Sequence, residues 1–248
     1  MSESLESVAT RVVRWQASHG RSHLPWQQTR DPYRVWLSEI MLQQTQVSTV
    51  LGYYARFLER FPDVDALASA SQDEVLGLWS GLGYYSRARN LHRCAQLVVA
   101  EHGGVFPSSA ELLAKLPGIG RSTAGAIAAF CFSQRVPILD ANVRRVLTRV
   151  VGFDGDVAVA KNERALWEHA EALLPVSDLA AAMPRYTQGM MDLGAGVCTP
   201  KTPQCLICPL MGVCVAQKEG VPERYPVKTR KLVRRSESWW LLLLIRLD

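Results

Sequence analysis

The 248-residue chain lacks long hydrophobic runs, and its longest one, from Trp239 to Ile245, is far too short to span a bilayer. The first 20 residues are polar and amphipathic and have no apolar stretch typical of a signal peptide. Alternating strand patterns are also missing before residue 239, whereas helical periodicity dominates. These absences argue against a membrane or secreted protein and predict an intracellular, cytoplasmic, all-α protein.

Most of the chain has no excess of either positive or negative charge. The net charge of +5 arises from the segment between Lys218 and Arg235, where seven basic residues accompany two acidic ones. Such a segment indicates contact with phosphate groups, although a solvated linker fits the same composition. We interpret residues 221–248 as a basic linker followed by the start of a further domain that is mostly absent.

Helices are predicted along most of the chain, and the short loops between them indicate an all-α fold. Asp31-Pro32 provides an N-cap and a first-turn proline for a helix that ends near Gln44. The patterns Ser71-x-x-Glu74 and Ser108-x-x-Glu111 are typical of helix N-termini. Further helices are expected near residues 8–20, 47–61, 85–102, 121–132, 141–151, 162–174 and 178–193.

The most informative motif is Leu116-Pro117-Gly118-Ile119-Gly120-Arg121-Ser122, which opens an apolar helix that is followed by Asp140. Two glycines at a helix start let backbone amides approach an anion, and the helix dipole favours negative charge there. A plain corner between two helices fits the glycines equally well. With the later carboxylate, however, the motif resembles the helix-hairpin-helix DNA glycosylases. In that superfamily the hairpin holds a DNA phosphate and the aspartate faces the extruded nucleotide.

Position 122 separates two classes within that superfamily. Relatives that also cut the DNA strand, such as endonuclease III, carry a lysine nucleophile there, whereas this chain has Ser122. A serine cannot form a Schiff base, so attack on the sugar is expected to come from water.

Four cysteines lie close together near the end of the chain, at Cys198, Cys205, Cys208 and Cys214. A tight Cys-x2-Cys pair with two outlying cysteines suits an iron–sulfur cubane. Structural zinc is the alternative, although its sites usually contain two close pairs. The spacing is that of endonuclease III and the adenine glycosylases, and it implies a [4Fe-4S] cluster. The loop that such a cluster would brace carries Lys201, which we expect to contact a DNA phosphate.

Glu39 lies in the block Trp36–Gln46 and shares a helix face with Val35, Trp36 and Leu42. Burial among such neighbours raises the pKa of a carboxyl group, whereas Asp140 at a helix N-terminus is expected to have the opposite environment and to stay ionised. Two carboxyl groups with separated pKa values are typical of a general acid and its electrostatic or nucleophilic partner. A surface position on an amphipathic helix is the alternative for Glu39.

Several blocks resemble the adenine DNA glycosylases of the MutY type, and the resemblance covers about residues 10–225. The blocks are Leu24-Pro25-Trp26, Ser38–Gln46, Gly81–Asn90 and Met190–Ala195. The resemblance implies that Glu39 protonates N7 of a flipped adenine, that Asp140 stabilises the resulting sugar cation, and that Asn142 orients Asp140. It also implies DNA-binding or base-binding roles for Trp26, Gln43, Gln44, Tyr84, Gly118, Gly120, Arg121, Ser122, Gln188 and Lys201.

Two of these groups have simpler alternatives. Gln43 and Gln44 are suited to hydrogen-bonding the orphaned partner base, but they also fit a polar helix end. Tyr84 resembles an intercalating wedge, but Tyr84 and Tyr85 could pack together at a helix start. Cys94 and Cys131 lie in apolar helical patterns and are predicted to be buried packing residues.

The resemblance implies two helical lobes with the active-site cleft between them. One lobe combines residues 1–28 with 135–220 and carries the cluster, and the other is a six-helix module at 29–134 with the hairpin at 116–122. The resulting hypothesis is a monomeric, monofunctional glycosylase of base excision repair that removes adenine paired with 8-oxoguanine or guanine in double-stranded, nucleoid-associated DNA. A mismatch thymine or uracil glycosylase and a non-catalytic DNA-binding relative are the alternatives. Full-length adenine glycosylases continue into a domain that recognises 8-oxoguanine, so the partner-base preference stays open.

Overall fold

The computed structural model describes residues 7–229, 236–238 and 240, and the regular structure in those ranges is entirely helical. The α-helices are α1 (Val8–His19), α2 (Pro32–Leu42), α3 (Val47–Arg60), α4 (Val64–Ser69), α5 (Gln72–Trp79), α6 (Ser86–His102), α7 (Ala110–Leu113), α8 (Arg121–Phe132), α9 (Ala141–Val151), α10 (Ala160–Ala172), α11 (Leu179–Asp192) and α12 (Val215–Lys218). A π-helical turn at Leu193–Val197 follows α11, and short 3₁₀ turns lie at Pro25–Gln27, Cys205–Ile207 and Pro222–Arg224. The all-α prediction is confirmed.

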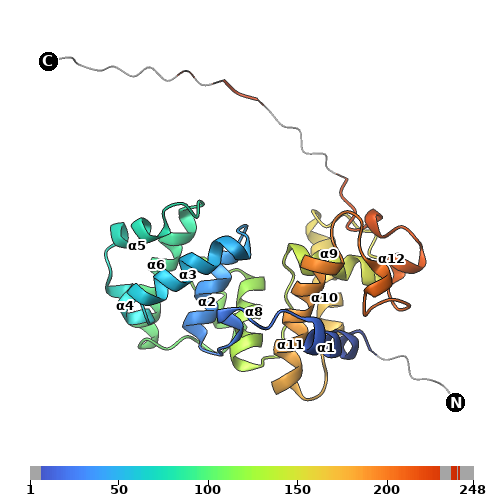
Figure 1. Cartoon of the computed structure of the whole chain (residues 1–248), viewed down its shortest axis with the longest axis horizontal. Helices are drawn as coiled ribbons and strands as arrows, with labels where there is room; N and C mark the ends of the chain where they lie inside the picture. Colours follow the sequence, from blue (N-terminus) through green and yellow to red (C-terminus); the bar gives the residue numbers. More distant parts are fainter. Residues whose placement is uncertain (1–6, 230–235, 239, 241–248) are drawn as a thin grey trace.

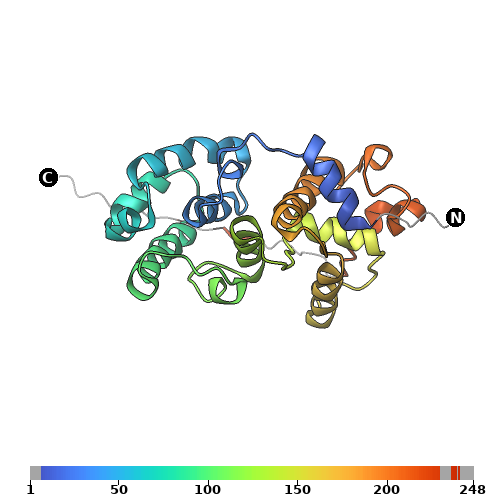
Figure 2. The ribbon, with the colours of Figure 1, turned by 90° about the horizontal axis from the view of Figure 1, so that it is seen from below.

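Two helical lobes lie side by side (Figure 1), one built from α2 to α8 and the other from α1 with α9 to α12. The chain leaves α1 in one lobe and crosses to the other before α2 begins (Figure 2). The first lobe has a buried core around Trp36 and Trp79, and the second has its own core. Helix α8 contributes side chains to both cores, so it forms the shared wall between the lobes.

Helix starts follow from local capping chemistry. The Asp31 carboxylate accepts a hydrogen bond from the Tyr33 amide, and Ser71 Oγ accepts one from the Glu74 amide, as expected of N-caps. The prediction for Ser108 was wrong by one residue, because it is Ser109 Oγ that accepts a hydrogen bond from the Leu112 amide in α7. Predicted boundaries elsewhere differ by one or two residues, since fraying helix ends carry little sequence signal.

The two cysteines outside the cluster motif have different surroundings. Cys94 is fully buried in the first core, as predicted. Cys131 is only partly buried, because it lies near the end of α8 beside the groups of the cleft, so its prediction as a buried residue was wrong.

None of the helices in the described ranges is long and apolar enough to cross a membrane. The apolar run Trp239–Ile245, predicted to belong to the start of a further domain, lies outside the described residues except for Trp240.

Candidate active site

A cavity of about 350 Å³ lies where the two lobes meet, which is within the range of small-molecule sites. Its walls come from the segment after α1, from α2 and from α11. Three predicted residues line it together, namely Trp26, Glu39 and Gln188. The cleft expected between the lobes is therefore present, and it contains the predicted acid.

Glu39 lies one turn before the end of α2, with Val35, Ser38 and Leu42 also lining the cavity. Burial among these groups, together with the smaller effect of the Asp140 charge, raises the pKa of Glu39 to about 8. A carboxyl group with this pKa stays protonated at neutral pH. It can therefore donate a proton to a base held in the cavity.

Asp140 is the N-cap of α9, and its Oδ1 accepts hydrogen bonds from the amides of Asn142 (2.6 Å) and Val143 (2.9 Å). Burial nevertheless raises the pKa of Asp140, against the opposing effects of these amides and of Arg145 and Arg144. The expectation that its environment is opposite to that of Glu39 was wrong, because burial desolvates both carboxyl groups. The difference is that amides and cations stabilise the ionised form of Asp140, whereas no such group lowers the pKa of Glu39.

Neighbouring residues fix the position of Asp140. Ser122 Oγ accepts a hydrogen bond of 3.0 Å from the amide of Leu139, the residue before Asp140. Asn142 contacts Asp140 through its backbone amide, while its side-chain Oδ1 accepts a hydrogen bond from Arg145 Nη2 at 2.8 Å. Ser122, predicted to replace a lysine and to bind DNA or the base, also ties the start of α8 to the segment that carries Asp140.

The π-helical turn after α11 packs against this segment. Arg145 Nη2 donates to the Gly194 carbonyl at 2.6 Å. A Cβ atom at Gly194 would lie only 2.6 Å from Cβ of Asn142, closer than real Cβ atoms approach one another. Glycine at this position therefore permits the close packing of the turn onto the start of α9.

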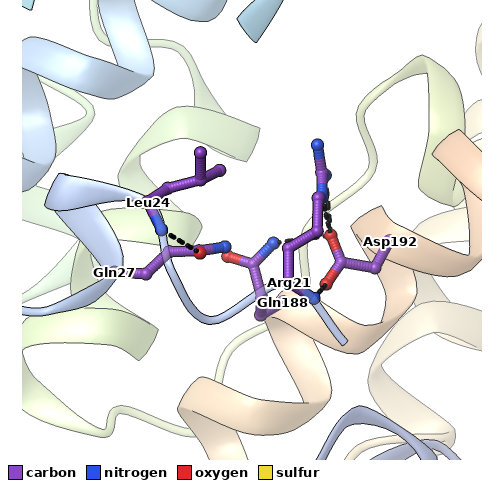
Figure 3. A network of polar contacts seen from close by, with 5 residues as sticks. All are labelled: Arg21, Leu24, Gln27, Gln188 and Asp192. Carbon is purple, nitrogen blue, oxygen red and sulfur yellow. Dashed lines mark hydrogen bonds and ion pairs between the residues drawn. The ribbon is translucent and has the colours of Figure 1, made fainter. Parts of the chain in front are cut away.

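A polar network forms one wall of the cavity (Figure 3). The nearly buried Asp192 accepts hydrogen bonds from Arg21 Nε at 2.7 Å and from the Arg21 amide at 2.9 Å. It also accepts one from Gln188 Nε2 at 2.9 Å, which leaves the side-chain oxygen of Gln188 available to a ligand. Gln27 Oε1 accepts a hydrogen bond from the Leu24 amide, while its Nε2 is buried without a partner.

Sequence reasoning missed Arg21, Gln27 and Asp192 as site residues. Asp192 belongs to the block Met190–Ala195 and Gln27 directly follows Trp26, so both were adjacent to a signal. Arg21 and Asp192 are far apart in the sequence, and only the packing of α1 along α11 brings them together.

Gln43, Gln44 and Tyr84 lie on two loops of the first lobe, between α2 and α3 and between α5 and α6. Gln44 and Tyr84 both have left-handed backbone conformations, with φ values of +57° and +49°. The Tyr84 side chain is 60% exposed, so the packed pair suggested as an alternative does not bury it.

The hairpin places Gly118 at φ +78°, where a Cβ would lie 2.9 Å from Cβ of Asn90 on α6. Gly120 is the N-cap residue of α8, so the first amides of this helix have no side-chain cap and can meet an anion. The Arg121 guanidinium carbon lies 3.9 Å from the centre of the Trp167 ring on α10. This cation–π contact holds Arg121 between the lobes, and its DNA contact stays a prediction.

The four clustered cysteines line one small cavity in the second lobe. In the described ranges, no three Cys, His, Asp or Glu side chains come close enough to hold a single metal ion. Four cysteine thiols around one cavity are the ligand set that a [4Fe-4S] cluster uses, so Cys198, Cys205, Cys208 and Cys214 fit such a cluster.

Arg149 is buried beside this cavity and secures the loop around it. Its Nη1 donates to Cys198 Sγ at 3.3 Å and to the Thr199 carbonyl at 2.7 Å. Lys201, two residues after Thr199, is exposed on this loop, and its DNA contact stays a prediction.

Comparison with known proteins agrees with this geometry. Residues 37–172 match the HhH-GPD superfamily of base excision DNA repair proteins, and residues 198–214 match the iron–sulfur binding domain of endonuclease III. The adenine DNA glycosylase of Buchnera aphidicola from Acyrthosiphon pisum is 42% identical over 233 residues, which cover 94% of this chain and 65% of that protein. The adenine DNA glycosylase of Mycobacterium tuberculosis H37Rv is 40% identical over 218 residues, covering 86% of this chain and 68% of that protein.

Solved structures show the same fold. A thermostable thymine-DNA glycosylase superposes with a TM-score of 0.75 at 28% identity, over 85% of this chain and 95% of that chain. A non-covalent DNA complex of endonuclease III superposes with a TM-score of 0.68 at 21% identity, over 86% of this chain and 94% of that chain. The chain spans less than two thirds of the length of the Buchnera relative. Its sequence and fold show that it belongs to the HhH-GPD superfamily of base excision DNA repair proteins and, within it, to the adenine DNA glycosylases.

Proposed function

We propose that the protein hydrolyses the N-glycosidic bond of adenine paired with 8-oxoguanine or guanine in double-stranded DNA, without cutting the strand. The observation that carries this proposal is Glu39, a carboxyl group held protonated in a cavity between the lobes. A group that only binds DNA has no use for a proton at this position. The adenine DNA glycosylases at 40–42% identity support adenine as the base.

In the proposed reaction, Glu39 donates its proton to N7 of the extruded adenine, so the base leaves as neutral adenine when the C1′–N9 bond breaks. Positive charge then develops on the sugar, and Asp140 stabilises it. Water adds to C1′, and its proton passes to the Glu39 carboxylate, which restores the starting state. Leaving-group protonation of this kind typically contributes about 10²–10⁴-fold to the rate.

Ser122 supports the absence of strand cleavage. Its hydroxyl accepts a hydrogen bond from the Leu139 amide and cannot form the Schiff base that a lysine would form. The [4Fe-4S] cluster has no redox part in this hydrolysis, which requires no electron transfer. Its expected contribution is to hold the loop that carries Lys201.

DNA contacts follow from the same arrangement. We infer that the uncapped amides at the start of α8 hold a backbone phosphate, and that Tyr84, Gln43 and Gln44 occupy the gap left by the extruded adenine. Opening the pair costs a few kcal/mol, which these contacts would offset. The protein would then act as a monomer on nucleoid DNA inside the cell.

The experiment is single-turnover incubation with duplexes that contain 8-oxoguanine:A, G:A, G:T or G:U pairs, each followed by hot alkali. Cleavage at adenine only after alkali is the expected result. Cleavage at thymine or uracil instead would support the activity that the name of the thymine-DNA glycosylase indicates for that protein. Cleavage before alkali would contradict the role given to Ser122. Binding without any base release would favour a non-catalytic relative.

A further inference from the structure

Arg87 is a buried cation whose hydrogen bonds all go to neutral oxygen atoms. It is the second residue of α6 and is only 9% exposed. Burial lowers the pKa of its guanidinium group, and its Nε atom is buried without a partner. A cation in the first turn of a helix is also opposed by the helix dipole. The stability of α6 therefore does not account for an arginine at this position.

The guanidinium group of Arg87 joins two loops that are distant in the sequence. Nη1 donates to three carbonyl oxygens at the end of α2, those of Ile40 (3.0 Å), Met41 (2.9 Å) and Gln43 (2.6 Å). Nη2 donates to the carbonyls of Leu82 and Gly83 (both 3.3 Å) in the loop that precedes α6. It also donates to Thr45 Oγ1 (3.1 Å), directly after Gln44. One side chain thus fixes the spacing between the Gln43–Gln44 turn and the loop that ends in Tyr84.

Both loops contain backbone strain at the residue expected to contact DNA. Gln44 and Tyr84 have positive φ values, and such conformations cost a non-glycine residue about 1–3 kcal/mol unless the surroundings impose them. The exposed Tyr84 ring has little packing of its own, and the Arg87 guanidinium carbon lies 5.5 Å from its centre. The same carbon lies 5.3 Å from the ring of the buried Trp79. Arg87 therefore supports the two strained residues from one buried point.

We propose that Arg87 is a positioning residue that holds the Gln43–Gln44 turn and Tyr84 as one rigid unit, so that wedge insertion and contact with the orphaned base occur in a single step. This inference rests on the proposed function, because it assigns both loops to the opening of the base pair. Arg87 then acts on base extrusion and leaves the breaking of the glycosidic bond to Glu39 and Asp140.

The test compares Arg87→Lys with the wild-type protein. Lysine keeps the charge but loses the planar fork that reaches both loops. Extrusion is followed by stopped-flow fluorescence on a duplex that carries 2-aminopurine opposite 8-oxoguanine, and release of the base is followed on the matching adenine duplex. Arg93→Lys, at an exposed arginine on the same helix, is the control.

We expect Arg87→Lys to slow the fluorescence change at least tenfold, with adenine release slowed by the same factor and the Arg93 control unchanged. Wild-type rates of extrusion in Arg87→Lys would overturn the proposal, even if adenine release were slow. Extrusion without adenine release in the wild-type protein would instead overturn the proposed function and leave the role of Arg87 standing.

A second measurement does not depend on the stability of the Arg87 variants. If the two loops act as one unit, the effects of Gln44→Ala and Tyr84→Ala on the extrusion rate will not add, and the double variant will resemble the slower single variant. The proposal would be overturned if the double variant slowed extrusion by the product of the two single factors. Thr45→Val, which removes one contact of Arg87, is expected to slow extrusion by about threefold while the melting temperature changes little.

Discussion

Replacing Glu39 with glutamine tests whether this carboxyl group is protonated at neutral pH. Glutamine keeps the shape of the side chain and removes its titration. The wild-type pKa is raised from 4.5 to about 8, so the folded protein keeps a proton between these pH values that the unfolded chain has already released. The free energy of unfolding of the wild type therefore falls as the pH rises from about 4.5 to 8, and the glutamine variant lacks this loss.

The size of this loss of stability follows from the two pKa values of Glu39, 4.5 and about 8. Each pKa unit between them corresponds to about 1.4 kcal/mol, so the free energy of unfolding can fall by at most about 5 kcal/mol. Solvent reaches Glu39 through the cavity, so the expected penalty is about 2–4 kcal/mol after screening. For a chain of this size, 1 kcal/mol moves the melting temperature by about 2–4 °C.

The assay is thermal melting of both proteins between pH 5.5 and pH 8.5. About 2.5 of the roughly 3.5 pH units between the two pKa values lie in this range. Relative to the wild type, the melting temperature of Glu39→Gln should therefore rise by about 3–11 °C from pH 5.5 to pH 8.5. Comparing the two proteins cancels the contribution of the cluster, which both carry. Glu59→Gln, on the exposed face of α3, controls for the loss of one negative charge.

Kinetics provide an independent check on the same group. Wild-type excision should be level below about pH 8 and fall about tenfold per pH unit above it, since only protonated Glu39 can donate. The glutamine variant should bind DNA and lose at least about 10²-fold in rate. The reasoning would be refuted if the melting temperatures of the two proteins changed equally with pH and the wild-type excision rate did not fall above pH 8.

Three further substitutions test the surroundings of the site. Gly194→Ala should slow single-turnover excision at least tenfold with DNA affinity retained, because its Cβ would collide with Asn142. Gly196→Ala is the control, since a Cβ there meets open space, and equal rates for the two variants would contradict the prediction. Ser122→Lys should add strand cleavage and a borohydride-trapped covalent complex, and the absence of any trapped complex would count against its placement near the sugar. Lys201→Ala should weaken DNA binding and reduce the salt slope by about one without changing the chemical step, and an unchanged slope would exclude the phosphate contact.

Features that depend on near neighbours in the chain were predictable. The N-caps at Asp31 and Ser71, the glycine hairpin and the spacing of the four cysteines each occupy a short stretch of sequence. The burial of Glu39 was predictable as well, since its helix presents Val35 and Leu42 on the same face. Capping and helical periodicity act over three or four residues, so the sequence contains the whole interaction.

Other properties depend on segments that meet only after folding. The raised pKa of Asp140 comes from burial by segments that pack around it, although the local signal, a helix N-terminus, indicates the opposite direction. The pairing of Arg21 with Asp192 and the contacts of Arg87 with two separate loops had no local signature.

The sequence by itself determined the helices and the hairpin, and it indicated the four cysteines proposed as cluster ligands and the acid proposed at position 39. Tertiary structure alone decided how the carboxyl groups are desolvated, which polar groups line the cavity and which buried cation joins the loops. The physical reason is that capping and periodicity arise from neighbours along the chain, whereas desolvation and long-range hydrogen bonds are summed over every segment that packs around a group.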